Sequence, residues 1–184
     1  MKPIIVRGGG DLATATIHRL CKSGYPVIIL ECEQPSAIRR LVSFCQAVYE
    51  GTMEVEGMTC SLAESFEQAL EQVSWNHPQL IVDPQGKCLE KYHPDILVDG
   101  ILAKKNLGTR KDMAELTIAL GPGFTAGEDV DYVIETKRGH YLGRIISQGA
   151  AIPNTGVPGV IGGYGKERVI HSPCPGIFHQ EKEI

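Results

Sequence analysis

Short apolar runs alternate with longer amphipathic stretches through the first 120 residues of the chain. Runs of this length, bounded by turn-forming or charged residues, predict buried strands. They occupy residues 4–6, 27–30, 80–82, 96–98 and 117–120. In the first connection, residues 11–23 carry apolar side chains at helical spacing, and Gly24 is a natural end for that helix. The alternation predicts an α/β fold with a mostly parallel sheet and helices on both faces.

The other connections carry weaker patterns. We expect a helix from residue 35 that turns Ile38, Leu41 and Val42 inward, and a short third strand over residues 47–50. The arginines at 39 and 40 would then either face solvent or reach the adenosine end of a ligand.

A second helix is predicted after a stretch of alternating polarity at residues 53–58, which indicates an extended edge or an irregular connection. Ser61 and Glu64 match the capping box, in which a hydroxyl and a carboxylate satisfy the first N–H groups of a helix. We expect a helix to begin there and to bury an apolar stripe.

The composition changes at residue 121. Twelve of the 21 glycines fall in the last 64 residues, and helical periodicity disappears. Residues 132–136, 141–146 and 168–170 instead predict β-strands separated by glycine turns.

The first apolar run leads directly into a glycine pattern typical of dinucleotide-binding folds. Gly8 allows a tight turn, Gly10 lets the backbone approach a pyrophosphate, and Ala13 allows close packing of helix on strand. The helix that follows directs its unpaired N–H groups and positive dipole end toward a bound anion. We therefore expect a Rossmann-like domain over residues 1–120. A glycine-rich β extension over residues 121–184 would pack on it, or the two would form one continuous domain.

The predicted cofactor-binding residues at this turn are Gly8, Gly9, Gly10 and Asp11. Glu31 ends the second strand, where its carboxylate can accept hydrogen bonds from a ribose. A carboxylate there would repel a 2′-phosphate, so NAD or another adenine nucleotide is favoured over NADP. The alternative is a unit that keeps the packing glycines and binds no nucleotide.

Other strand ends supply further candidates, because the ligand crevice of a parallel sheet lies beyond the carboxyl ends of its strands. Two groups qualify as contacts to a small anionic ligand: Lys104, Lys105 and Asn106, and then Gly121, Gly123 and Thr125. The alternatives are a solvated basic pair and a plain glycine turn.

Another basic group flanks a hairpin-like turn and comprises Arg138, His140 and Arg144. His140 is either an acid–base group or a surface histidine. Catalytic residues are otherwise unknown, because no motif identifies a nucleophile.

Charge and cysteine usage narrow the class of protein. A net charge of −4 gives nucleic acid no general reason to bind. The six cysteines form no CxxC pair and no spacing typical of a metal site, which predicts reduced thiols and a cytoplasmic location. No apolar run approaches the roughly 18 residues needed to span a membrane, so no membrane association is expected.

Several longer segments resemble the YqeB-like accessory proteins of selenium-dependent molybdenum hydroxylases, a family related in its Rossmann part to the XdhC/CoxI maturation factors. The matching segments are residues 8–13, 103–106, 119–131, 133–136, 138–140, 142–144 and 154–159. Members of the family are usually longer, with a further glycine-rich β segment, so the chain is expected to be truncated at its C-terminus.

The resemblance implies a maturation factor that handles the molybdenum cofactor, or its terminal sulfur or selenium ligand, for a client hydroxylase. The bound group would be a nucleotide or a molybdopterin-type cofactor, and a homodimer is a possible assembly. Two other function classes stay open. One is an NAD-dependent oxidoreductase with His140 as proton donor, and the other is a non-catalytic interaction scaffold with an empty cleft.

Overall fold

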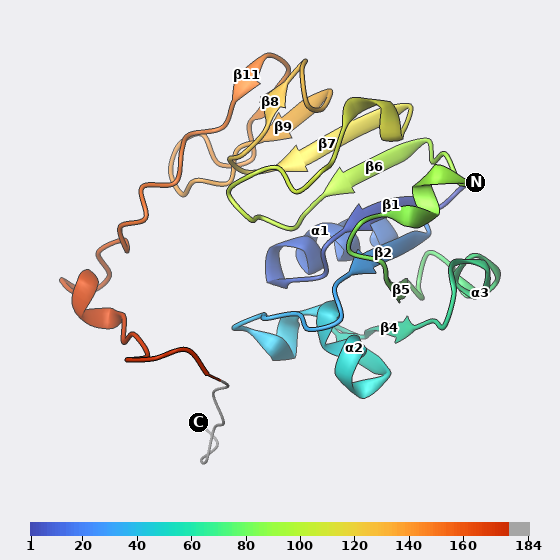
Figure 1. Ribbon diagram of the computed structural model, residues 1–184, viewed down its shortest axis with the longest axis horizontal. Helices are drawn as coiled ribbons and strands as arrows, with labels where there is room; N and C mark the ends of the chain where they lie inside the picture. Colours follow the sequence, from blue (N-terminus) through green and yellow to red (C-terminus); the bar gives the residue numbers. More distant parts are fainter. Residues whose placement is uncertain (177–184) are drawn as a thin grey trace. The chain divides into compact units, whose positions relative to one another are not determined.

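A nine-stranded sheet forms the centre of the first of two compact units, Met1–Pro153 and Asn154–Ile184, in a computed structural model that describes residues 1–176 (Figure 1). Its strands are β1 (Ile4–Arg7), β2 (Val27–Glu31), β3 (Thr52–Val55), β4 (Met58–Leu62), β5 (Gln79–Val82), β6 (Ile96–Asp99), β7 (Leu116–Leu120), β9 (Tyr132–Ile134) and β10 (Ile145–Ile146). The strand order is β10-β9-β7-β6-β1-β2-β5-β4-β3. Six of the eight neighbouring pairs are parallel, which confirms the expected mostly parallel α/β sheet.

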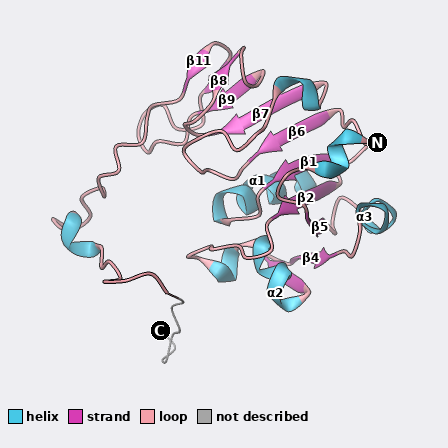
Figure 2. Cartoon of the chain, in the orientation of Figure 1, coloured by secondary structure: helices cyan, strands magenta, loops and turns pink. Residues whose placement is uncertain are grey.

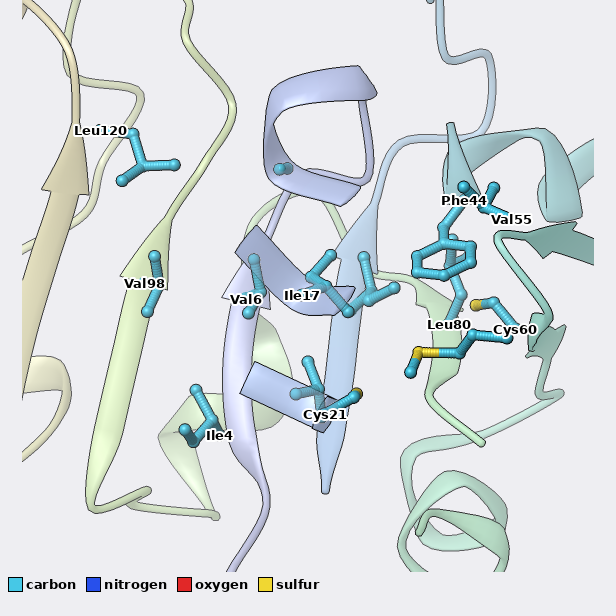
Figure 3. Close-up of a cluster of buried hydrophobic side chains, with 14 residues drawn as sticks. Ile4, Val6, Ile17, Cys21, Phe44, Val55, Cys60, Leu80, Val98 and Leu120 are labelled. Carbon is cyan, nitrogen blue, oxygen red and sulfur yellow. The ribbon is translucent and has the colours of Figure 1, made fainter. Parts of the chain in front are cut away.

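Helices cover both faces of this sheet. They are α1 (Asp11–Lys22), α2 (Ala47–Glu50) and α3 (Phe66–Gln72). Ile4 and Val6 of β1 point to one face, where Ile17 and Cys21 of α1 join them in a buried cluster (Figure 3). Ile5 points to the opposite face and belongs to a second cluster that contains Ala69 of α3. The alternation of side chains along each strand thus builds two apolar layers, one on each face of the sheet.

The strand order reverses direction at the centre of the sheet. From β1 the chain proceeds to β2, forms β3 and β4 at the sheet edge and returns to β5, all on one side, and afterwards adds β6, β7 and β9 on the other. The carboxyl ends of β1 and β6 therefore lie side by side, with their connections leaving in opposite directions. Such a reversal opens a crevice beyond the strand ends, where parallel sheets bind ligands.

The two predicted elements between β2 and β3 are wrong. Residues 47–50 form the short helix α2, not a strand, and Gly51 ends it with φ 78°. The expected helix from residue 35 is reduced to the 3₁₀ turns Arg40–Val42 and Phe44–Gln46. Ile38 and Leu41 are 98% and 86% exposed, so these side chains do not turn inward.

The helix predicted from Ser61 begins four residues later. Ser61 belongs to β4, and Ser65 caps α3 by accepting a hydrogen bond from the Gln68 amide at 3.1 Å. Both serines are followed three residues later by Glu or Gln, so either one matches the capping pattern. Because Ser61 pairs with Gln79 in the sheet, Ser65 is the residue that caps the helix.

The glycine-rich part forms two of its three expected strands in shortened form, β9 and β10, and two strands that were not predicted, β8 (Thr125–Ala126) and β11 (Gly149–Ala150). β9 and β10 extend the main sheet, and β8 pairs with β11 in a separate two-stranded sheet. Residues 168–170 are not a strand: Arg168 ends the 3₁₀ turn Lys166–Arg168, and residues 169–170 have no regular structure. Residues 151–176 are mostly loop (Figure 2). Within residues 1–176, every helix is too short or too polar to cross a bilayer.

Candidate functional site

A cleft of about 460 Å³ opens at the carboxyl ends of β1, β2 and β6, where the strand order reverses. Three segments line most of it: the turn from β1 into α1, the end of β2 with the chain that follows, and residues 100–102 after β6. Four predicted residues are among the lining, namely Gly8, Gly10, Asp11 and Glu31.

Gly8 is required by packing within the protein. Its φ of 91° is unfavourable for other residues, and a Cβ there would stand 3.0 Å from the backbone of Ile101. Gly100 has a similar role directly after β6, because its Cβ would lie 2.9 Å from the Cβ of Ala13. The small residues at 8, 13 and 100 therefore let α1, β1 and β6 approach closely.

Gly10 differs from both of these glycines. It precedes α1 with φ −66° and ψ 179°, an extended conformation that any residue can adopt. A Cβ there would meet no protein atom within 4 Å. Neither backbone strain nor packing in the chain calls for glycine at this position. A ligand that approaches the backbone from the cleft would call for one.

Glu31 ties the end of β2 to the glycine turn. One carboxylate oxygen accepts the Gly9 amide at 2.8 Å, and the other accepts the Cys32 amide at 2.8 Å. A carboxylate oxygen has two acceptor positions, so each can still accept a ligand hydroxyl. Glu31 thus fixes the turn and keeps acceptor capacity toward the cleft.

Asp11 and Arg39 form an ion pair at the cleft. Asp11 accepts the Leu12 amide at 2.9 Å through one oxygen and pairs with the Arg39 guanidinium at 2.6 Å through the other. The Asp11 carboxylate therefore occupies part of the positive helix end that an anion would use. With Glu31 and Arg39, the ionised side chains that line the cleft carry a net charge of −1.

The chain after β2 holds the glycine turn from outside. The Gly9 carbonyl accepts the Thr14 hydroxyl at 3.0 Å and the Cys45 amide at 2.8 Å. The Thr14 hydroxyl in turn accepts the Phe44 amide at 2.9 Å. Sequence reasoning missed Thr14 and Cys45, because only the folded chain shows that residues 44–45 return to the turn.

A buried polar network beneath the cleft was also missed. Arg7 donates one hydrogen bond to the Thr109 hydroxyl at 2.5 Å and another to the Pro84 carbonyl at 2.8 Å. Thr109 donates to Asp99 at 2.6 Å, and Arg7 lies 4.0 Å from the same Asp99 oxygen. Burial raises the pKa of Asp99, against the opposing effect of hydrogen bonds from Thr109 and the Ile101 amide. The network fastens the loops that follow β5 and β6 to the end of β1.

The residues predicted after β6 lie beside the cleft and do not line it. The Asn106 side chain accepts the Gly108 and Thr109 amides at 2.8 and 2.9 Å, so it shapes its own turn. Lys104 has φ 64° and donates to the Leu102 carbonyl at 2.8 Å. A Cβ at Gly123 would lie 2.6 Å from the backbone nitrogen of Lys105, so the turn at residues 104–106 contacts the turn at residues 121–125.

The candidate turn at residues 121–125 donates backbone amides to other groups of the protein. The Gly121 amide donates to the Ile134 carbonyl at 2.8 Å, and the Thr125 amide donates to Asp129 at 2.8 Å. A Cβ at Gly121 would lie 3.0 Å from Leu102, which lines the cleft. The structure thus brings the three predicted turns to one edge of the sheet. Of these, only the glycine turn at residues 8–11, together with Glu31, lines the cleft.

Two cysteines line the cleft, Cys32 and Cys45. Burial raises the pKa of both thiols, that of Cys45 to about 12, so they are protonated at neutral pH. Within the described residues, no three side chains of His, Cys, Asp or Glu are grouped to hold a metal ion. His140 lies in the turn between β9 and β10 and does not line the cleft.

Comparison with known proteins found one similar sequence, named "Uncharacterized protein YqeB", from Escherichia coli (strain K12). It is 49% identical over 181 residues, which are 98% of this chain and 34% of that protein. The chain thus spans about a third of the length of the relative it matches. No family model and no solved structure matches.

Proposed function

We propose that the chain is the nucleotide-binding part of an accessory factor that matures a selenium-dependent molybdenum hydroxylase. Its cleft would hold an adenine nucleotide such as NAD or ADP, or the phosphate end of a molybdopterin-type cofactor. The proposal joins two supports: the geometry of the cleft, and the resemblance of its sequence motifs to the YqeB-like accessory proteins.

The order of the parallel strands supports a Rossmann-like assignment. Read from β5 through β2, β1, β6 and β7 to β9, the strands follow the order 3-2-1-4-5-6 of dinucleotide-binding sheets, once the β3–β4 edge is set aside. In such sheets the ligand lies at the reversal beside the first strand, which is the location of the cleft.

Gly10 carries the proposal. Gly8, Gly100 and Ala13 are explained by contacts within the chain, but the space in front of Gly10 contains no protein atom within 4 Å. A diphosphate at the start of α1 would use that space and the unpaired N–H groups of the first helical turn. Glu31 would accept a hydrogen bond from the ribose on the other side of the cleft.

The maturation role rests on the sequence resemblance. The residues that carry it continue far beyond the glycine turn, through β7 and β9 and the turn that follows. A redox enzyme with His140 as proton donor is less well supported, because His140 does not line the cleft in which a nicotinamide would bind.

Calorimetric titration of the full chain with ADP and NAD tests the binding step, with Gly10→Ala as the variant and Gly159→Ala as the matched control. Both glycines face open space and lack a positive φ, so both variants should fold. We expect Gly10→Ala to weaken binding at least tenfold and Gly159→Ala to leave it unchanged. Equal affinity in all three proteins would remove the glycine turn from the site.

A cellular test addresses maturation. Loss of this factor should lower the activity of the client hydroxylase without lowering the amount of client polypeptide. The wild-type factor should restore the activity, and Gly10→Ala should not. Full client activity in the absence of the factor would contradict the maturation role.

A further inference from the structure

The turn between β9 and β10 forms a second cavity that the proposed function does not use. It measures about 440 Å³, and its lining includes Tyr141, Arg144, Ile145, Ile146 and Ile152. One wall is therefore cationic and aromatic, and the isoleucines supply apolar surface. A cavity of this size with a few convergent polar groups is typical of small-molecule sites.

The Arg144 guanidinium is held over an aromatic ring and remains available to a ligand. Its central carbon lies 5.6 Å from the centroid of the Tyr141 ring. A guanidinium held over the face of a ring keeps N–H groups free to bind a carboxylate or phosphate in bidentate fashion. Among residues 1–176, no carboxylate lies within ion-pair distance of Arg138 or Arg144, whereas Arg39 and Arg110 are paired.

The turn that borders this cavity is basic, although the two charged residues in the cavity lining itself, Glu135 and Arg144, have opposite signs. Residues 136–153 contain no Asp or Glu but include Lys137, Arg138 and Arg144, in a chain whose net charge is −4. The acid in the cavity lining is Glu135, which is only 2% exposed. Its two oxygens accept the Lys137 and Ile152 amides at 2.7 and 2.8 Å. Glu135 therefore fixes the turn and leaves a net charge of +2 on residues 135–144.

Backbone hydrogen bonds keep the turn in shape without a ligand. The Glu135 amide donates to the Arg144 carbonyl at 3.0 Å, and the Gly143 amide donates to the Glu135 carbonyl at 2.8 Å. The Arg144 amide donates to the Tyr141 carbonyl at 3.0 Å, which places the two stacked side chains on one tight turn.

We infer that this cavity binds a small organic oxyanion, with its phosphate or carboxylate on Arg144 and its apolar body against Ile145 and Ile152. The site is separate from the cleft at Gly10 and does not depend on the proposed function. An organic phosphate and an organic carboxylate would both present an oxyanion attached to an apolar group. Separate titrations with one probe of each kind distinguish them.

Phenyl phosphate and benzoate are suitable probes, titrated separately into the full chain by calorimetry with inorganic phosphate as the reference that lacks an apolar body. We expect saturable binding of at least one organic probe and weaker binding of inorganic phosphate. Arg144→Gln should weaken the organic probe at least tenfold, because it removes a charge-assisted bidentate contact. Arg138→Gln removes the same charge from the same turn, outside the cavity lining, and should change affinity less than twofold.

Gly10→Ala should leave the organic probe unaffected, which separates this site from the nucleotide cleft. Arg144 is exposed, so its replacement should not prevent folding. Equal weakening by Arg138→Gln and Arg144→Gln would overturn the inference in favour of a diffuse charge effect. Binding of a poly-glutamate peptide without binding of either small probe would also overturn it, in favour of a protein partner.

Discussion

Two neighbouring residues of the glycine turn have opposite effects on an anion in the cleft. Gly10 leaves space in front of the first turn of α1, and Asp11 places a negative charge on that same turn. Arg39 neutralises part of this charge from the chain after β2. The cleft is therefore better suited to a ligand with one or two phosphates than to one with an additional phosphate near Glu31.

Asp11→Asn should increase the affinity for ADP about two- to five-fold, because a charge near a helix N-terminus contributes about 0.3–1 kcal/mol. The same loss should lower helix stability by a similar amount, since Asp11 faces the positive end of α1. Calorimetric titration measures the first effect and urea unfolding the second. Asp112→Asn is the control, because Asp112 is exposed and pairs only locally with Arg110. Unchanged or weaker binding in Asp11→Asn would contradict an anion at this helix end.

At the residue scale, sequence could identify Gly8, Gly10 and Glu31 but not the groups that support them. The spacing of the former follows from one continuous strand, turn and helix. Phe44 and Cys45 belong to a segment after β2 that returns to Thr14 and Gly9, and Arg7 acts through Thr109, 102 positions away. No local pattern reports such contacts.

The packing of α1 on the sheet depends on small residues at one crossing point. Gly100→Ala would bring two methyl groups to 2.9 Å, so helix and strand would have to separate. We expect a loss of about 1–3 kcal/mol in the free energy of unfolding, as for other overpacked cores. Urea unfolding measures it against Gly159→Ala, which faces open space. Wild-type stability in Gly100→Ala would show that the contact is not tight.

Asp131 joins the entry of β9 to β7 through an ionised carboxylate. It accepts the Thr117 amide and hydroxyl at 2.8 and 2.9 Å and pairs with Lys111 at 3.0 Å. Burial would raise the pKa of Asp131, but hydrogen bonds from Thr117 and Lys111 outweigh it and lower the pKa. The folded pKa lies below the unfolded one, so the stabilisation is present above about pH 4 and is lost as the pH falls through the folded value.

Asp131→Asn should therefore cost on the order of 1 kcal/mol at pH 7 and much less at pH 3. Urea unfolding at a series of pH values gives the difference, and Asp112→Asn, with its exposed side chain, should show almost none. A penalty for Asp131→Asn that stays constant from pH 7 to pH 3 would show that ionisation of Asp131 contributes nothing.

Elements with long or fully apolar patterns could be predicted, and short ambiguous ones could not. The central strands follow from runs such as residues 27–30, which can only be buried. Residues 47–50 are too few for a period of two to be told from one of 3.6, and the structure makes them a helix. Ile38 and Leu41 have helical spacing, but both side chains are exposed and the segment forms only a 3₁₀ turn.

For the whole molecule, the sheet edge at the carboxyl ends of the parallel strands accounts for both proposed sites. The connections that leave this edge supply the glycine turn, Glu31 and the basic turn after β9. Their charges differ: the charged residues that line the cleft sum to −1, whereas those that line the second cavity, Glu135 and Arg144, sum to zero within a turn whose residues 135–144 sum to +2. Sequence predicts that the glycine turn and Glu31 share an edge, because both follow strands of the expected parallel sheet, but it does not place the basic turn after β9 at that edge.

Titration of the ¹⁵N-labelled full chain with ADP, followed through its amide resonances, tests the central claim most directly. The account predicts concentration-dependent shifts of the Gly9, Gly10 and Leu12 amides at the start of α1, with the Glu54 and Thr59 amides of the distant β3–β4 hairpin unmoved. Absence of any shift at the glycine turn under saturating ADP, or shifts confined to other segments, would contradict it.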